Sequence, residues 1–145
     1  MMRAVAWIVV GTFASLGAWA NCQSPRTLMA ERNNDGTVVG LVVTPAQFAR
    51  APTWKPGKGE PPLSISRVVE VARAWGKTQF KGYDSFEVRS ISLNQSGCTP
   101  GETYWYYLVV FTPVSAGKPA HGNGQFAGVL LDGTVIGPTA VKDAF

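Results

Sequence analysis

The segment at residues 103–112, TYWYYLVVFT, constrains the fold of this chain more than any other feature. Its aromatic and β-branched residues favour a strand, and the segment is apolar on both of the faces that a strand presents. Tyr104 and Tyr106 would face one way, and Trp105 and Tyr107 the other. Such a strand is predicted to lie in the middle of a sheet with both faces covered, so the chain must supply two covers.

Residues 64–76, SISRVVEVARAWG, supply the first cover, because they form the one clear helix that the sequence predicts. Gly76 is expected to end this helix. Its polar face carries Arg67, Glu70 and Arg73, which we interpret as a solvated surface where Glu70 pairs with one arginine. The apolar residues that recur at the helical period and line the other face are Ile65, Val68, Ala72 and Trp75.

The second cover is expected from residues 21–62. The stretch at 37–44, TVVGLVVT, is rich in β-branched residues and predicts a strand. A weaker strand at 27–30 precedes it, and residues 33–36 between them, NNDG, favour a tight turn. This part of the chain is therefore predicted to form an N-terminal strand or hairpin.

A connection rich in Pro and Gly follows at residues 45–62. Proline excludes regular structure from most of it, although residues 46–50 can form one helical turn. We expect Trp54 to anchor the connection onto the body of the protein. If this N-terminal part does not cover the second face, Trp105 and Tyr107 become candidates for an exposed binding patch.

The remaining sequence predicts short strands joined by turns, with a loop at 113–124 and a frayed or docked tail at 139–145. Asp132 and Gly133 read as a two-residue hairpin turn. The first strand changes its apolar phase after Val88, which indicates a bulge. The predicted strands lie at residues 86–93, 125–131 and 134–136.

Together these elements predict an α+β fold with one main helix packed on a three- to five-stranded antiparallel meander sheet. The N-terminal strand or hairpin would complete it. Residues 21–62 and residues 63–145 are expected to form a single domain.

Residues 1–20 have the features of a secretory signal, with Arg3, an apolar run and a final Ala-Trp-Ala. Cleavage after Ala20 would leave a periplasmic or secreted protein without a membrane span. A retained anchor fits less well, because the apolar run is short and interrupted by glycine and serine. Lipid modification of Cys22 is not expected, because the residues before it lack the small-residue pattern of a lipoprotein signal.

Cys22 and Cys98 are expected to form a disulfide in an oxidising compartment. Two cysteines and one histidine fall short of the four ligands of a structural zinc site, so no metal is expected, and no cofactor either. The net charge of +4 is too small and too scattered to favour nucleic acid. An aromatic content of 11% with only 15% charged residues excludes intrinsic disorder.

The order of the helix, the strand TYWYYLVVF and the final VLLDGTVIG resembles the PepSY-type and cystatin-like small domains of exported bacterial proteins. The resemblance covers about residues 62–137. In that family the helix packs on a meander, and the last hairpin carries an Asp and a Gly before a short closing strand. The resemblance implies a binding or inhibitory module, and it carries over no catalytic residue.

The residues themselves predict no enzyme. His121, the single histidine, stands in a Gly- and Pro-rich loop, where a solvated side chain is expected rather than a general base. The sequence lacks the glycine patterns that bind phosphates. The carboxylates that could serve as a catalytic pair each have a simpler interpretation in a turn, a loop or an outer strand face: Asp84, Glu87, Glu102 and Asp132.

The hypothesis that fits best is a module that binds another exported or envelope protein, for example as an inhibitor or immunity-type partner. Its surface would combine the loops at 53–60 and 114–124. The alternatives are a ligand carrier or enzyme with a pocket between helix and sheet, and a structural envelope component. The candidate contact residues in the two loops are Trp54, Lys55, Lys58, Lys118 and His121.

Overall fold

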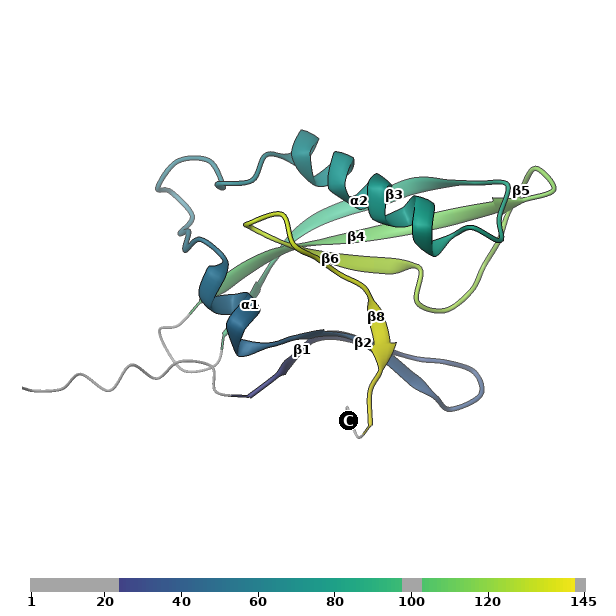
Figure 1. The fold of residues 1–145 in the computed structure, drawn as a ribbon, viewed down its shortest axis with the longest axis horizontal. Coiled ribbons are helices and arrows are strands. Elements are labelled where there is room, and N and C mark those ends of the chain that lie inside the picture. The colour runs from purple at the N-terminus through teal and green to yellow at the C-terminus, as the bar shows by residue number, and fades with distance from the viewer. Residues whose placement is uncertain (1–23, 98–102, 143–145) are drawn as a thin grey trace, which may run out of the picture.

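The computed structural model describes residues 24–97 and 103–142 (Figure 1). It has an α+β architecture with two antiparallel sheets, one of three strands and one of five. The predicted signal at 1–20 and both cysteines lie outside the described residues. No helix in the described ranges is long and apolar enough to cross a membrane. The elements are β1 (Arg26–Arg32), β2 (Val38–Val43), α1 (Pro45–Arg50), α2 (Ile65–Gln79), β3 (Ser85–Ser96), β4 (Tyr104–Ser115), β5 (Lys118–Pro119), β6 (Phe126–Leu130), β7 (Val135–Ile136) and β8 (Pro138–Ala140).

The strand predicted to be central is β4, which lies inside the five-stranded sheet of order β3-β4-β6-β7, with β5 also beside β4. The register between β3 and β4 shifts between Val88 and Ser90, which confirms the predicted bulge. The predicted loop at 113–124 is wrong in its first half, because β4 continues to Ser115 and turns back into β5. Ala116 and Gly117 have φ values of 50° and 70°, which is the geometry of a tight two-residue hairpin turn.

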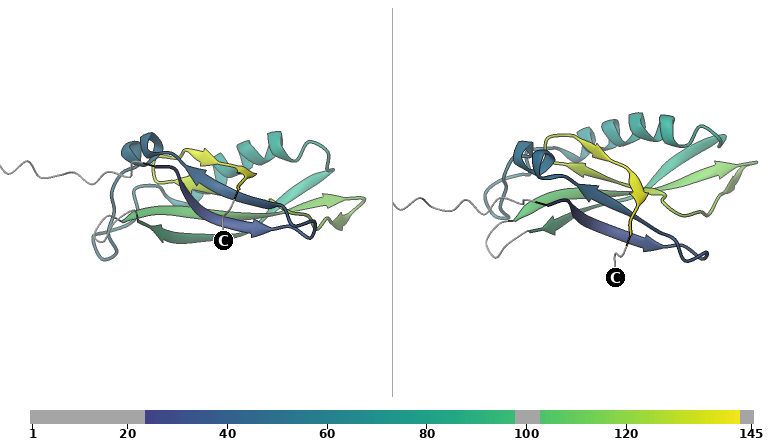
Figure 2. Two further views of the ribbon diagram at one scale, coloured as in Figure 1. Left: turned by 90° about the horizontal axis from the view of Figure 1, so that it is seen from below. Right: turned by 60° about the horizontal axis from the view of Figure 1, so that its bottom comes forward.

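Helix α2 covers one face of this sheet, as predicted (Figure 2). Val68 and Ala72 are fully buried, and Trp75 packs against Phe111 with ring centroids 5.6 Å apart. Ile65, however, is 61% exposed, so its predicted place in the buried stripe is wrong. It stands in the first turn of the helix, and the buried face begins one turn later.

Gly76 does not end the helix, which continues to Gln79. It is buried, and a Cβ at this position would lie 2.6 Å from Cε2 of Phe86. The glycine therefore lets the helix backbone approach β3 closely.

The opposite face of β4 is covered by the three-stranded sheet of order β1-β2-β8 and by α1 (Figure 2). Leu41 of β2 and Phe48 of α1 are buried in a core that includes Tyr106 and Leu130. Tyr106 faces this core, whereas Tyr107 faces α2. The alternating directions predicted for the aromatic strand are therefore confirmed.

The expected C-terminal tail is partly a strand. Pro138–Ala140 form β8, which pairs with β2, so the two ends of the described chain share one sheet. The chain crosses between the sheets at Gly137, where a Cβ would lie 3.0 Å from the Trp75 ring. The pairing has its reason in the free side of β2, which offers unpaired backbone groups to the last residues.

Two hairpins, β1-β2 and β6-β7, have the same turn. Asn33 N donates to Thr37 O at 2.8 Å, and Leu130 N donates to Thr134 O at 2.9 Å. Each loop therefore spans three residues, and the two-residue turn predicted at 132–133 is wrong by one residue. The added residue allows the loop glycine to take a positive φ as part of a bulge.

Candidate functional site

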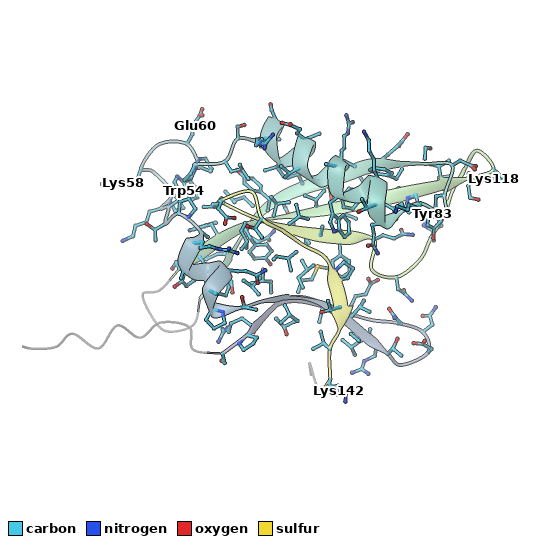
Figure 3. All side chains as sticks on the ribbon, viewed as in Figure 1. Trp54, Lys58, Glu60, Tyr83, Lys118 and Lys142 are labelled. Atoms are coloured by element: carbon cyan, nitrogen blue, oxygen red, sulfur yellow. The ribbon has the colours of Figure 1, made fainter. Side chains whose placement is uncertain are left out.

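The loop of residues 52–60 is held as a closed ring at one end of the molecule (Figure 3). The indole Nε1 of Trp54 donates to Gly59 O at 3.1 Å, and Lys58 N donates to Lys55 O at 3.1 Å. The Trp54 ring also meets Trp105 edge-on, with centroids 5.1 Å apart. Lys55 and Lys58 are exposed on the 52–60 loop. The predicted anchor is therefore present, and it presents two cations on an ordered loop.

Trp105 and Tyr107 do not form an exposed patch. Tyr107 is only 3% exposed, and its hydroxyl donates to Leu63 O at 2.8 Å. Burial raises the pKa of the Tyr107 hydroxyl above its ordinary value. Trp105 is half-buried, and its indole Nε1 is buried without a hydrogen-bond partner. The structure thus buries Tyr107 and leaves Trp105 half-buried, packed against Trp54.

The second predicted loop lies elsewhere. Lys118 is exposed at the β5 end of the molecule, near Tyr83, whereas Trp54 and Lys58 lie at the opposite end (Figure 3). The two loops therefore do not form the single contact surface that we expected. The sequence contained no signal for this separation, because it follows from the length of β4, which runs between the two ends.

His121 lines a small cleft of about 230 Å³ that residues of both sheets share. Glu31 comes from β1, Arg89 from β3, and His121 and Gln125 from the chain before β6. The Glu31 carboxylate accepts a bond from Gly124 N at 3.3 Å. Sequence reasoning missed this grouping, because its members are far apart in the chain and meet only when the sheets stack.

The candidate acids are engaged separately. Asp84 accepts a bond from Ala116 N at 2.6 Å, and Asp132 accepts one from Thr134 N at 2.9 Å. Glu87 is exposed on β3, and Glu102 lies outside the described residues. Among the described residues, no three His, Cys, Asp or Glu side chains gather where they could hold a metal ion.

A wider, open groove of about 550 Å³ runs between α2 and β3. Arg73 and Lys77 line it from the helix, and residues 85–88 line it from the strand. Arg67 pairs with Glu70 at 2.6 Å, which confirms the predicted ion pair and leaves Arg73 outside it.

The molecule thus offers three surface features: the 52–60 loop, the cleft between the sheets and the groove between α2 and β3. Each is built on elements of the packed core. Comparisons of the chain with protein-family models, with curated proteins and with solved structures found no match.

Proposed function

We propose that this chain is a small exported module that binds another exported or envelope protein, with the 52–60 loop at the centre of its contact surface. The observation that carries the proposal is the hydrogen bond from Trp54 to Gly59, which closes the 52–60 loop, together with the packing of Trp54 against Trp105. A loop that is already held in one conformation loses little conformational entropy on binding. Recognition residues are commonly found on loops of this kind, placed by a rigid scaffold.

The charges of the loop indicate the chemistry of the partner. Lys55 and Lys58 are exposed, and among the described residues neither has a carboxylate within 4.0 Å. Glu60 is also exposed in the loop, so the two lysines exceed the acidic charge locally. A partner with acidic groups opposite the lysines would be complementary.

The proposal includes the family resemblance and the role that it implies. Helix α2 over an antiparallel sheet, followed by a hairpin with Asp132 and Gly133, supports a PepSY-type or cystatin-like relationship over residues 62–137. Inhibitory and immunity-type partners of secreted proteins are the kind of module that this relationship favours.

Export through the signal at 1–20 is part of the same proposal, as is a disulfide between Cys22 and Cys98. The side chain of Arg26 donates to Gly97 O, so described residues close in sequence to the two cysteines are in contact. We expect the mature chain to begin at Asn21. Its mass should be two hydrogens lower than the mass of the reduced chain. Uptake of two alkyl groups without a reductant would contradict the disulfide.

Cross-linking in the source cell tests the binding proposal directly. A photoreactive residue in place of Lys58 should capture a protein partner, and the same residue in place of Lys142, exposed elsewhere on the surface, serves as the control (Figure 3). Trp54→Ala should abolish capture from position 58, because the 52–60 loop loses both the Trp54–Gly59 hydrogen bond and its packing on Trp105. Equal capture from both positions, or capture that survives Trp54→Ala, would contradict the proposal.

The cleft between the sheets favours a second candidate function, that of a carrier for a small ligand. The pocket expected between helix and sheet is filled by core side chains such as Val68 and Val109, so the ligand would instead bind beside Arg89 and His121. Opposite charges on Arg89 and Glu31 suit a small zwitterion such as an amino acid. Titration with leucine should shift the NMR signals of Arg89 and His121, and Arg89→Gln should remove the effect. Unchanged spectra would exclude this use of the cleft.

A further inference from the structure

The outer side of β3 is a free sheet edge. β3 is twelve residues long and pairs with β4 alone, and no other strand within residues 24–97 and 103–142 lies beside it. The unpaired backbone groups of an edge strand are a template for another strand. The bulge between Val88 and Ser90 divides this edge into two parts, and the part at residues 85–88 faces the groove under α2.

The backbone directions in this part can be derived from β4. The N–H of Phe111 bonds to the chain before β6 at 2.8 Å, and the carbonyl of Pro113 accepts a bond from the residue after β5 at 2.7 Å. Both β4 residues therefore direct their backbone groups away from β3. Their partners are Val88 and Phe86. Opposite residues in an antiparallel pair point either toward or away from each other together, so Phe86 and Val88 direct their N–H and C=O groups outward.

Helix α2 forms the second wall of the groove. The contact between Gly76 and the Phe86 ring sets the helix close to the start of β3. Arg73, about one turn before that glycine, and Lys77, the residue directly after it, line the groove from the helix. The arrangement, a free strand edge beside a helix, is the one used by domains that bind a peptide as an added strand.

The charge of the groove is positive. Arg73 and Lys77 are exposed, and among the described residues neither has a carboxylate within 4.0 Å. Glu87 contributes one negative charge from β3, which leaves the two cations in excess. Phe86 and Val88 are half-buried and supply apolar surface.

We propose that this groove binds an extended acidic segment of a protein partner, which joins the five-stranded sheet beside residues 85–88 and directs carboxylates to Arg73 and Lys77. The proposal rests on the proposed function as a protein-binding module, and it names a chemistry for the partner. A peptide backbone is the ligand that can both donate to and accept from the outward groups of Phe86 and Val88.

A second copy of the chain is the other occupant with a strand to offer. Antiparallel pairing of two β3 edges would place both α2 helices on the same face of a continuous sheet. Arg73 and Lys77 of both copies would then line the same groove, and like charges in this position repel. Charge complementarity therefore favours the acidic partner.

The test uses the mature chain and a short synthetic peptide in which Val and Glu alternate. Amide hydrogen exchange by NMR should slow at Phe86 and Val88 when the peptide is added, whereas the inward-facing amide of Glu87 should be protected with and without it. A peptide with Lys in place of Glu tests the charge, and a peptide with N-methylated amides tests the backbone pairing. Both control peptides should bind about tenfold more weakly or not at all.

Charge reversal on the helix provides the matched variants. Arg73→Glu with Lys77→Glu should weaken binding of the acidic peptide by about tenfold or more, and Lys142→Glu should leave it unchanged. The double variant should improve binding of the Lys peptide, a gain that a merely damaged protein would not show.

Each result separates this inference from the proposed function. Binding of all peptides alike, or binding without slower exchange at Phe86 and Val88, would overturn the groove even if cross-linking from position 58 still captures a partner. Protection of these amides that rises with protein concentration alone would assign the edge to a second copy and would also overturn it. Peptide binding with the expected charge dependence supports the groove even if the 52–60 loop captures nothing.

Discussion

The β1-β2 and β6-β7 hairpins have the same turn in different surroundings. The sequence Asp-Gly-Thr-Val occurs at 35–38 and again at 132–135. Gly36 has a φ of 86° and Gly133 a φ of 88°. In each turn the Asp carboxylate accepts bonds from the N–H and the hydroxyl of the following Thr. The strands differ, because β6 is buried along its whole length whereas β1 is half-buried or exposed.

The comparison shows which level of structure determines which feature. The four residues Asp-Gly-Thr-Val and their own hydrogen bonds determine the turn. It therefore forms in the same way beside the partly exposed strand β1 and beside the buried strand β6. The length of the strands is set by their neighbours. β2 runs for six residues between β1 and β8, whereas β7 ends after two, where the chain leaves for the other sheet.

The largest difference between the two hairpins is expected in the free energy of unfolding lost when the residue before each loop is replaced by Ala. Leu130 is 1% exposed in the core between the sheets, and Leu130→Ala should lower the free energy of unfolding by about 2–5 kcal/mol through the cavity that it leaves. Asn33 stands at the matching place and bonds its side chain to Thr37, so Asn33→Ala should cost about 1 kcal/mol. Urea unfolding of both variants measures this, and equal losses would contradict the comparison.

The second-largest difference in stability is expected at the glycines that follow the two turns, Gly40 and Gly137. A Cβ at Gly40 would lie 2.8 Å from Met29 O, a backbone atom, so Gly40→Ala requires the hairpin to move and should cost about 1–3 kcal/mol. At Gly137 the nearest atom belongs to the Trp75 side chain, at 3.0 Å. We expect a smaller loss there, visible as a higher melting temperature than that of Gly40→Ala. The reverse order would show that the Trp75 ring is the more rigid neighbour.

The glycines within the two loops should lose the same amount of stability when replaced by Ala. Gly36 and Gly133 both have a positive φ, and a Cβ at either would meet nothing within 4 Å. Only backbone strain remains, so Gly36→Ala and Gly133→Ala should each cost about 1 kcal/mol. If the two losses, measured by urea unfolding, differ by more than about the 0.5 kcal/mol of ordinary scatter, the surroundings influence the turn after all.

The smallest effect concerns pH. The hydroxyl and N–H of Thr37 hydrogen-bond to the Asp35 carboxylate and lower its pKa below the ordinary value. The pKa is lower in the folded chain, so this contribution to stability is complete above the unfolded pKa of about 3.9 and is lost as the pH falls through the folded pKa. NMR titration should show the Asp35 pKa rising toward its ordinary value in Thr37→Val. An unchanged pKa would contradict the assigned cause.

The features that the sequence predicted well depend on local patterns. The two apolar faces of residues 103–112, the helical period of Val68, Ala72 and Trp75, and the positions, though not the exact lengths, of the turns at both Asp-Gly pairs required no knowledge of distant residues. Ile65 fits the same period and is exposed, because a period defines a face but not where the sheet beneath it ends.

The features that the sequence missed depend on distant pairing. Pro138–Ala140 have no strand signal of their own, and they become β8 because β2 has a free side. Gly76 resembles a helix end locally, but its role depends on Phe86 across the core. The same reason explains the candidate surface, since Lys58 and Lys118 are separated by the length of β4, and Arg89 and His121 are brought together by stacked sheets.

The pairing of β8 with β2 has a consequence for synthesis. Ala140 is opposite Val39, about 100 residues earlier, so at roughly 5–20 residues per second β2 waits on the order of 5–20 s for its second neighbour. Until then the nascent chain cannot complete the layer beneath β4. A stop codon in place of Gly137 would remove β8, and it should therefore harm this protein far more than the three residues of that strand suggest.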